Sequence, residues 1–155
     1  MSAYVGIQPS LRTATKADIP LLLTVREQTM SEYLLASGVE PTEEDQIQRV
    51  LARFDCAQII LLANQPIGLL KIVRDGKQWE LVQIQIVPEK QGGGIGTQLV
   101  QKLLSDAVAT KASVSLSVLK ANPARRLYER LGFRIVKDKG HAYEMHFRDN
   151  HPLAR

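Results

Sequence analysis

The stretch Gln91-Gly92-Gly93-Gly94-Ile95-Gly96-Thr97 decides how the rest of the sequence is interpreted. It follows an alternating apolar segment that ends at Val87-Pro88, and it precedes a segment with apolar residues at helical spacing. The first turn of a helix presents unpaired N–H groups and the positive end of the helix dipole, and glycines let that backbone approach a ligand closely. The pattern therefore predicts a site for phosphate or pyrophosphate, the alternative being that the glycines form only a flexible turn.

Two other phosphate-binding motifs do not fit these residues. A Walker A loop ends in Gly-Lys-Ser/Thr, but Gly96 is followed by Thr97 and Gln98, so the lysine is missing. A dinucleotide fingerprint needs its third glycine at the position of Thr97 and an acidic residue about 20 positions later, and residues 114–119 contain none. Both alternatives are excluded.

The patterns on both sides of the turn predict one α/β domain over residues 1–155, with a mixed β-sheet flanked by helices. Capping patterns begin the first two helices, at Thr15 with Asp18 and at Thr42 with Asp45, and Asn122-Pro123 begins the last one. Residues 31–41 are expected to form a loop or a broken helix. The expected order is β-α-α-β-β-β-α-β-α-β-β, with strands over 11–13, 57–63, 67–73, 78–87, 113–119, 133–137 and 142–147, and later helices over 95–108 and 122–131.

Composition and charge exclude several classes of protein. The net charge of +4 is modest, and the basic residues are scattered without interleaved aromatics, so nucleic-acid binding is not expected. No run of 18 apolar residues and no signal-peptide pattern occurs, so we expect a cytoplasmic protein without a membrane segment. The lone Cys56, in an apolar stretch, is expected to be a buried structural thiol. No cluster has metal-ligand spacing, so no metal is expected.

Two segments together resemble one family. Gln91-x-x-Gly94-x-Gly96 matches the Q/R-x-x-G-x-G/A signature of the GNAT N-acetyltransferases, and residues 122–133, from Asn122-Pro123 to Gly132-Phe133, resemble the second diagnostic segment of that family. The order of elements is also similar to the GNAT fold. The resemblance covers nearly the whole chain and implies acetyl-CoA as co-substrate.

The resemblance also implies where CoA would bind. The family holds the CoA pyrophosphate on the amides of the glycine-rich turn, and it splays its fourth and fifth strands so that Ile86 and Val87 offer backbone groups to the pantetheine. Asn122 is either a simple N-cap or also a contact to CoA, and Arg125 is expected near the nucleotide phosphates. The turn residues expected to bind the cofactor are Gln91, Gly92, Gly93, Gly94, Ile95, Gly96 and Thr97.

Two residues are expected to be catalytic. The resemblance makes Tyr128 the general acid that protonates the departing CoA thiolate, the alternative being a core tyrosine that anchors its helix. Glu80 lies eleven positions before Gln91, where histone-acetylating members carry a glutamate, and it is the candidate base for the amine. Its alternative is a carboxylate in solvent. Gln83 and Gln85 can position water or the amine but cannot replace a base.

The expected activity is transfer of an acetyl group from acetyl-CoA to a primary amine by direct attack. The alternatives are a non-catalytic CoA-binding or interaction module with the same fold, and an enzyme for longer acyl-CoAs. The acceptor is a small-molecule or peptide amine, chosen by residues 30–39 and the last two strands. The resemblance also makes a homodimer an expectation, since homodimers are common among relatives.

Overall fold

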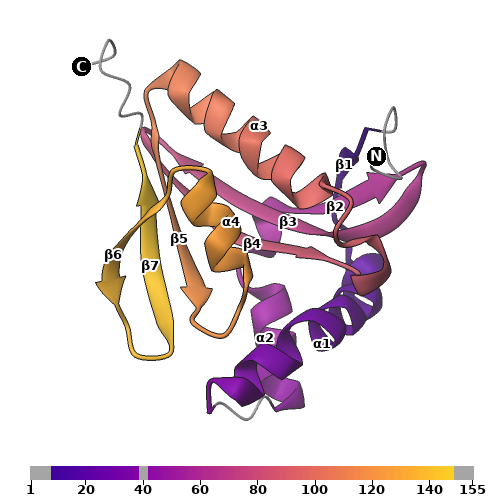
Figure 1. Ribbon diagram of the computed structural model, residues 1–155. Coiled ribbons are helices and arrows are strands. Elements are labelled where there is room, and N and C mark those ends of the chain that lie inside the picture. The colour runs from indigo at the N-terminus through magenta and orange to yellow at the C-terminus, as the bar shows by residue number, and fades with distance from the viewer. Residues whose placement is uncertain (1–7, 39–41, 149–155) are drawn as a thin grey trace.

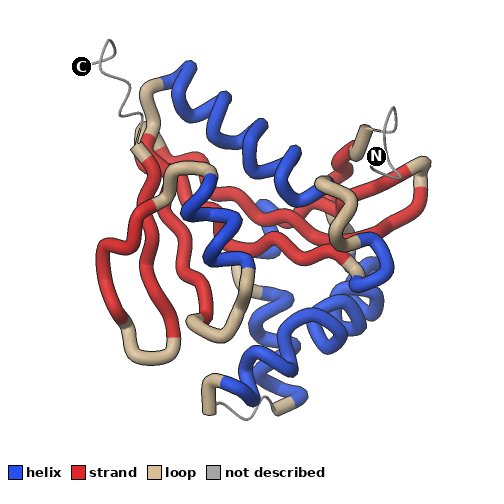
Figure 2. Tube along the Cα trace, viewed as in Figure 1, coloured by secondary structure: helices blue, strands red, loops and turns tan. Residues whose placement is uncertain are grey.

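The computed structural model describes residues 8–38 and 42–148, and in these a seven-stranded mixed sheet runs through the centre of the molecule. The strand order is β1-β2-β3-β4-β5-β7-β6. Helices cover both faces of the sheet (Figures 1 and 2). The elements are β1 (Ser10–Thr13), α1 (Ile19–Ala36), α2 (Glu43–Leu51), β2 (Ala57–Leu62), β3 (Gln65–Asp75), β4 (Gln78–Ile86), α3 (Ile95–Thr110), β5 (Ser113–Leu119), α4 (Ala124–Arg130), β6 (Arg134–Asp138) and β7 (Ala142–Phe147).

The order of helices and strands confirms the predicted GNAT-like order, but the first helix is longer than expected. Helix α1 continues without a break through Ala36, so the expected loop or broken helix over 31–41 is wrong for residues 31–36. Residues 39–41 lie outside the described residues. The helix ends where Ser37 donates its N–H to Tyr33 O, followed by Gly38 in a left-handed conformation (φ +79°). No helix in the described part of the chain is long and apolar enough to cross a bilayer.

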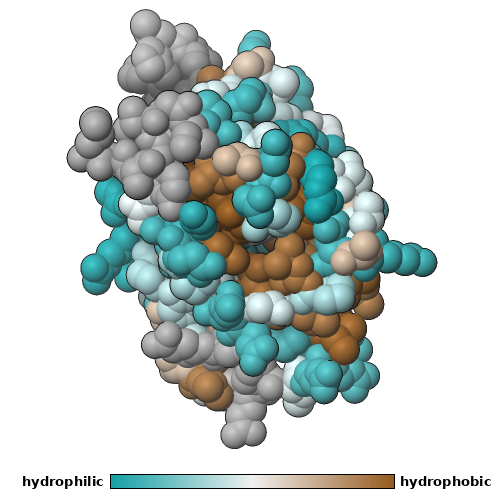
Figure 3. Space-filling view, turned by 90° about the vertical axis from the view of Figure 1, so that its right-hand side faces the viewer, coloured by the Kyte–Doolittle hydropathy of each residue, from teal (hydrophilic) through white to brown (hydrophobic). Residues whose placement is uncertain are grey.

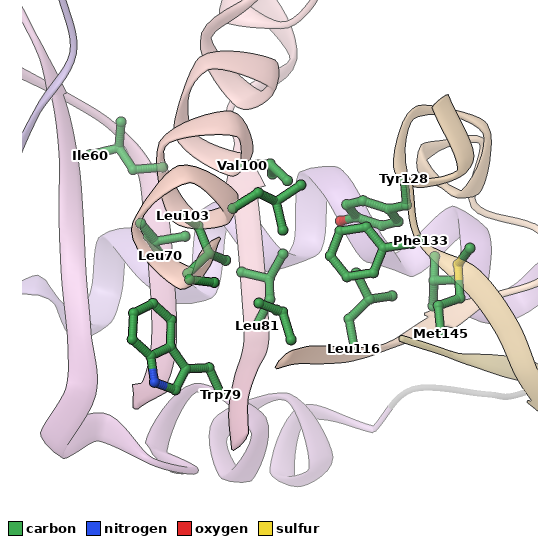
Figure 4. Close-up of a cluster of buried hydrophobic side chains, with 14 of the residues drawn as sticks. Ile60, Leu70, Trp79, Leu81, Val100, Leu103, Leu116, Tyr128, Phe133 and Met145 are labelled. Carbon is green, nitrogen blue, oxygen red and sulfur yellow. The ribbon is translucent and has the colours of Figure 1, made fainter. Parts of the chain in front are cut away.

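Two apolar clusters hold the helices to the two faces of the sheet. The larger one packs α3 and α4 against the sheet and includes Val100, Leu103, Tyr128 and Phe133 (Figure 4). The smaller one packs α1 and α2 through Leu22 and Val50. Burial of such side chains stabilises a fold by about 1.5–3 kcal/mol each.

A buried cation fixes the end of α2 to the sheet. Lys71 of β3 is 0% exposed, and its Nζ donates hydrogen bonds to the carbonyl oxygens of Arg49 (3.1 Å), Val50 (2.8 Å) and Ala52 (2.6 Å). The last carbonyls of a helix have no partner within the helix, and a cation also interacts favourably with the negative end of the helix dipole. Lys71 therefore caps α2 from the strand beneath it.

Strands β4 and β5 are paired over only part of their length. They are the only parallel neighbours in the sheet as described, and their three pairs are Gln78↔Ser113, Trp79↔Val114 and Glu80↔Ser115. Just beyond these pairs, the pairing of β4 with its other neighbour, β3, is irregular. Lys71 pairs with Gln83 and Ile72 with Leu81, so Val82 is an extra, bulged residue in β4. A bulge bends its strand, so β4 departs from β5 after this point. The gap between the unpaired ends positions the site described below.

Cys56 is less buried than the structural thiol that the sequence predicted. It lies in a short 3-10 turn (Phe54–Cys56) before β2, is half-buried, and places its Sγ 3.1 Å from Arg53 O. Partial burial raises the pKa of its thiol. The buried apolar residues of β2 begin one residue later, at Ala57.

Candidate active site

The glycine-rich turn between β4 and α3 depends on two glycines with left-handed backbones. Gly92 has φ +82° and Gly94 has φ +85°, and a side chain at either position would strain the backbone although it would meet open space. Gly94 is the N-cap of α3, so the turn leads directly into the first N–H groups of that helix. Gly96 has an ordinary backbone, and a Cβ there would lie 3.6 Å from Ile86 Cδ1.

The side chain of Gln91 fastens this turn to the end of β4. Its Nε2 donates a hydrogen bond to Ile86 O at 2.8 Å. The adjacent Val87 donates its N–H to Ile67 O (2.8 Å), and its carbonyl accepts from Lys90 N (3.0 Å). The backbone groups of Val87, expected to be offered to a ligand, thus already have partners within the chain.

A cavity of about 410 Å³ opens beside the turn, and we call it the glycine-turn cavity. Figure 3 shows a hollow on this side of the molecule, with hydrophobic residues along it and hydrophilic residues around it. Its size is within the range of small-molecule sites. The lining residues come from α1, β4, the turn, α3 and α4: Thr29, Met30, Tyr33, Ile84, Gln85, Ile86, Lys90, Gln91, Gly92, Gly94, Ile95, Gly96, Thr97, Val100, Asn122, Pro123, Ala124, Leu127 and Tyr128.

A second cavity, of about 370 Å³, lies between the parted strands β4 and β5 and the helices α1 and α2, and we call it the arginine cavity. Both cavities are lined by Met30, Ile84, Gln85, Asn122 and Tyr128. They therefore meet at the gap between the two strands. The other residues lining the arginine cavity are Arg26, Leu34, Arg49, Leu81, Val82, Gln83, Leu116, Ser117, Val118, Leu119, Lys139, His141 and Ala142.

Tyr128 stands where the two cavities meet. It is 7% exposed, and its ring packs edge-on against Phe133 with 5.7 Å between ring centroids. Figure 4 shows the ring extending from α4 with the hydroxyl pointing away from that helix. No described residue hydrogen-bonds this hydroxyl. Burial raises the pKa of Tyr128 to about 12, so the phenol keeps its proton at neutral pH and is available as a proton donor.

The remaining expected site residues divide into two groups. Asn122 lines both cavities, and its Oδ1 also accepts a hydrogen bond from Ala124 N at 2.9 Å, so it serves the start of α4 as well. Arg125 lines neither described cavity; its guanidinium is 3.3 Å from Glu129 and lies over the Tyr143 ring. Glu80 also lies outside both cavities, exposed on the last paired rung of β4 and β5.

Sequence reasoning missed several residues at the site. Arg26 and Arg49 come from two different helices, and only the packing of α1 against α2 brings them to one cavity. Gly68 of β3 is also needed, because a Cβ there would lie 2.1 Å from Gln85 O. A glycine inside a predicted strand is itself a sign of close backbone approach and could have indicated this contact.

Comparison with known proteins identifies the family. The model of the acetyltransferase (GNAT) domain matches residues 55–135, just over half of the chain. The chain belongs to the GNAT acetyltransferases. No curated protein matches this GNAT chain.

Solved structures share the GNAT fold across nearly the whole chain. An acetyltransferase from Thermus thermophilus is 25% identical, with a TM-score of 0.71 over 96% of this chain and 99% of that one. The PaiA N-acetyltransferase from Thermoplasma acidophilum, in complex with coenzyme A, is 15% identical, with a TM-score of 0.69 over 91% and 99%. Naa50 of Arabidopsis thaliana, in complex with the bisubstrate analogue CoA-Ac-MVNAL, is 14% identical, with a TM-score of 0.62 over 90% and 97%.

Proposed function

We propose that this GNAT protein transfers the acetyl group of acetyl-CoA to a primary amine by direct attack, with residues 1–155 acting as one N-acetyltransferase domain. The observation that carries the proposal is the gap between β4 and β5, where the glycine-turn cavity and the arginine cavity meet beside Tyr128. Two substrates that enter from opposite sides can react there without a covalent enzyme intermediate. Coenzyme A is bound to the structurally similar PaiA, which supports the choice of donor.

The glycine-turn cavity is the proposed site of acetyl-CoA. The first N–H groups of α3 and the left-handed backbone at Gly92 and Gly94 would receive the pyrophosphate. Gln91 acts by holding this turn against β4, and the pantetheine would follow the open edge of β4 near Ile86. Thr97 and Asn122 line the same cavity.

In the reaction, the nitrogen lone pair of the neutral amine attacks the thioester carbon, and the carbon–sulfur bond breaks. The thiolate leaves as CoA and receives a proton, while the amine nitrogen loses one, so that the products are an N-acetyl amine and CoA. Tyr128 gives its proton to the sulfur as negative charge develops there, and the phenolate regains a proton from solvent after CoA leaves. The proton of the amine leaves either to His141, which lines the arginine cavity, or through water to Glu80.

Ligand-dependent stability tests the donor. A ligand at 100 times its Kd stabilises a protein by about 2.7 kcal/mol, so acetyl-CoA should raise the melting temperature, whereas NADH and ATP at the same concentration should not. An unchanged melting temperature with saturating acetyl-CoA would refute the cofactor assignment. Acetyl-CoA binding without CoA release for any class of amine would instead identify a non-catalytic CoA-binding module. Initial rates with both substrates varied should give the intersecting lines of direct transfer rather than the parallel lines of a covalent intermediate.

A further inference from the structure

The arginine cavity holds a buried positive charge without a carboxylate partner. Arg26 is 5% exposed, and its Nε donates to Gln46 Oε1. No ion pair in residues 8–38 and 42–148 involves Arg26 or Arg49. A buried charge is normally compensated by an opposite charge, because its desolvation is otherwise strongly unfavourable.

The groups around Arg26 further disfavour its charged form in the absence of an anion. Burial, together with repulsion from Arg49, lowers the pKa of Arg26 to about 10. Lys139 lines the same cavity, and no Asp or Glu belongs to its described lining. Asp45 borders a neighbouring groove with the two arginines, but it forms no ion pair with either of them in the described residues. The compensating charge is therefore not supplied by the described lining of the cavity.

A polar group on the sheet side of the same cavity has no hydrogen-bond partner. Gln83 Oε1 is buried and is the only side-chain nitrogen or oxygen among the described buried atoms without a hydrogen bond. Gln83 lies on β4 within the stretch that has parted from β5, whereas Arg26 and Arg49 lie on the helices that cover it. The cavity thus offers a hydrogen-bond acceptor on the sheet and a cationic pair on the helices.

We propose that the acceptor is an amine that also carries a carboxylate, with the carboxylate bound by Arg26 and Arg49 and the amine directed by Gln83 toward the strand gap. This inference rests on the proposed acetyl transfer and names its substrate class. A guanidinium matches a carboxylate through two parallel N–H donors, and an amine N–H satisfies the Gln83 oxygen. Free amino acids have both groups and suit a cavity of about 370 Å³. Polyamines and aminoglycosides, which carry several positive charges, would be repelled.

Product binding tests the inference without requiring turnover. The CoA-loaded protein is titrated with the N-acetyl derivatives of the twenty L-amino acids and with the corresponding N-acetyl carboxamides, and binding is followed by calorimetry. We expect the best carboxylate to bind at least tenfold more tightly than its carboxamide. Equal binding of every pair, or no binding of any carboxylate, would overturn the inference. Glucosamine 6-phosphate and glucosamine form a further pair, and a preference confined to the phosphate would overturn the assignment to a carboxylate.

Substitutions of the arginines connect the preference to the cavity. Arg26→Met should remove the preference for carboxylate over carboxamide without lowering the melting temperature, because it deletes an uncompensated buried charge. Arg49→Gln, at an exposed position, should reduce the preference in a chain that folds normally. Arg134→Gln on the exposed strand β6 is the matched control and should leave it intact. A preference retained in both cavity variants would overturn the inference.

The two proposals fail in different ways. Free-CoA release is measured with L-amino acids, their carboxamides and spermidine as acceptors. Selective binding of carboxylates without release of CoA from any amine supports a carboxylate site at Arg26 and Arg49 and refutes acetyl transfer. Release of CoA with spermidine but with no amino acid overturns the inference and leaves acetyl transfer standing.

Discussion

Gln91 and Ile86, five residues apart, are joined across the glycine-rich turn by a 2.8 Å hydrogen bond from the side-chain amide to the backbone carbonyl. The bond ties the start of the turn to the last residue of β4. The family signature allows glutamine or arginine at this position, and both carry N–H donors. This bond supports the proposed role of Gln91, which is to hold the turn against β4 at the proposed phosphate site.

Substitution of Gln91 should weaken acetyl-CoA binding more than it slows the chemical step. Gln91→Leu removes a donor whose net contribution is about 1 kcal/mol, which corresponds to roughly a fivefold increase in the Kd of acetyl-CoA. Gln91→Arg retains a donor and should stay closer to the wild type. Calorimetric titration measures both variants, and an unchanged Kd in Gln91→Leu would contradict the positioning role.

The glycines of the turn should respond unequally to alanine. Gly94→Ala places a side chain on a left-handed backbone (φ +85°), which costs about 1–2 kcal/mol and should distort the proposed phosphate site. Gly96→Ala places its Cβ at an ordinary 3.6 Å from Ile86 Cδ1 and should keep both folding and acetyl-CoA binding. Urea unfolding and acetyl-CoA titration of the pair provide the comparison. Equal losses of stability and of acetyl-CoA affinity in both variants would show that the glycines are needed for flexibility and not for a left-handed backbone.

Removal of the Tyr128 hydroxyl should lower kcat and spare binding. Tyr128→Phe keeps the ring packed against Phe133 and deletes only the proposed proton donor. We expect a loss in kcat of about 10²-fold with an unchanged thermal shift from acetyl-CoA. Full turnover in this variant, with any amine that the wild type acetylates, would show that Tyr128 serves only in packing and is not the proton donor.

The two routes for the amine proton predict different pH profiles. His141→Gln should reduce kcat/KM most at pH values where the amine must still lose a proton, because His141 lines the arginine cavity and can take that proton directly. Glu80→Gln should have a smaller effect, since Glu80 lies outside both cavities and can take the proton only through water. Profiles of both variants against the wild type decide between the routes. A larger effect of Glu80→Gln would establish the water-mediated route instead.

The sequence predicted the order of elements and the glycine-rich turn because both depend on local patterns. Alternation identifies strands, and the turn needs only glycines between a strand and a helix. The end of α1 was missed, although Gly38 was a signal for it. The arginine cavity could not be predicted, because Arg26 and Arg49 meet only through tertiary packing. Counting back from Gln91 places Glu80 on β4 but does not reveal where β4 and β5 part.

The ion pair between Arg12 and Asp18 should make part of the stability depend on acid pH. Its closest contact is 2.8 Å, and the Arg12 hydrogen bond lowers the pKa of Asp18 to about 2 from an ordinary value of 3.8. Because the folded pKa is the lower one, the stabilisation is complete above pH 3.8 and is lost as the pH falls toward 2. Solvent around Arg12 screens the ion pair and keeps its contribution to the free energy of unfolding small.

Urea unfolding of the wild type and of Arg12→Leu at pH 7 and pH 2 measures this contribution. The variant should be less stable at pH 7, and the difference between the two proteins should shrink at pH 2. A difference that does not change with pH would mean that Arg12 stabilises the fold through packing alone.

Lys71 has a consequence for chemical labelling of this protein. Its amine is enclosed by three carbonyl oxygens at the end of α2, so an acylating reagent cannot reach it while α2 stays docked on β3. Exposed lysines such as Lys102 are open to the same reagent at all times. Modification of Lys71 relative to Lys102 would therefore report how often α2, which carries Arg49, detaches from the sheet. The rate at which Lys71 is labelled would thus measure how often α2 moves away from the arginine cavity.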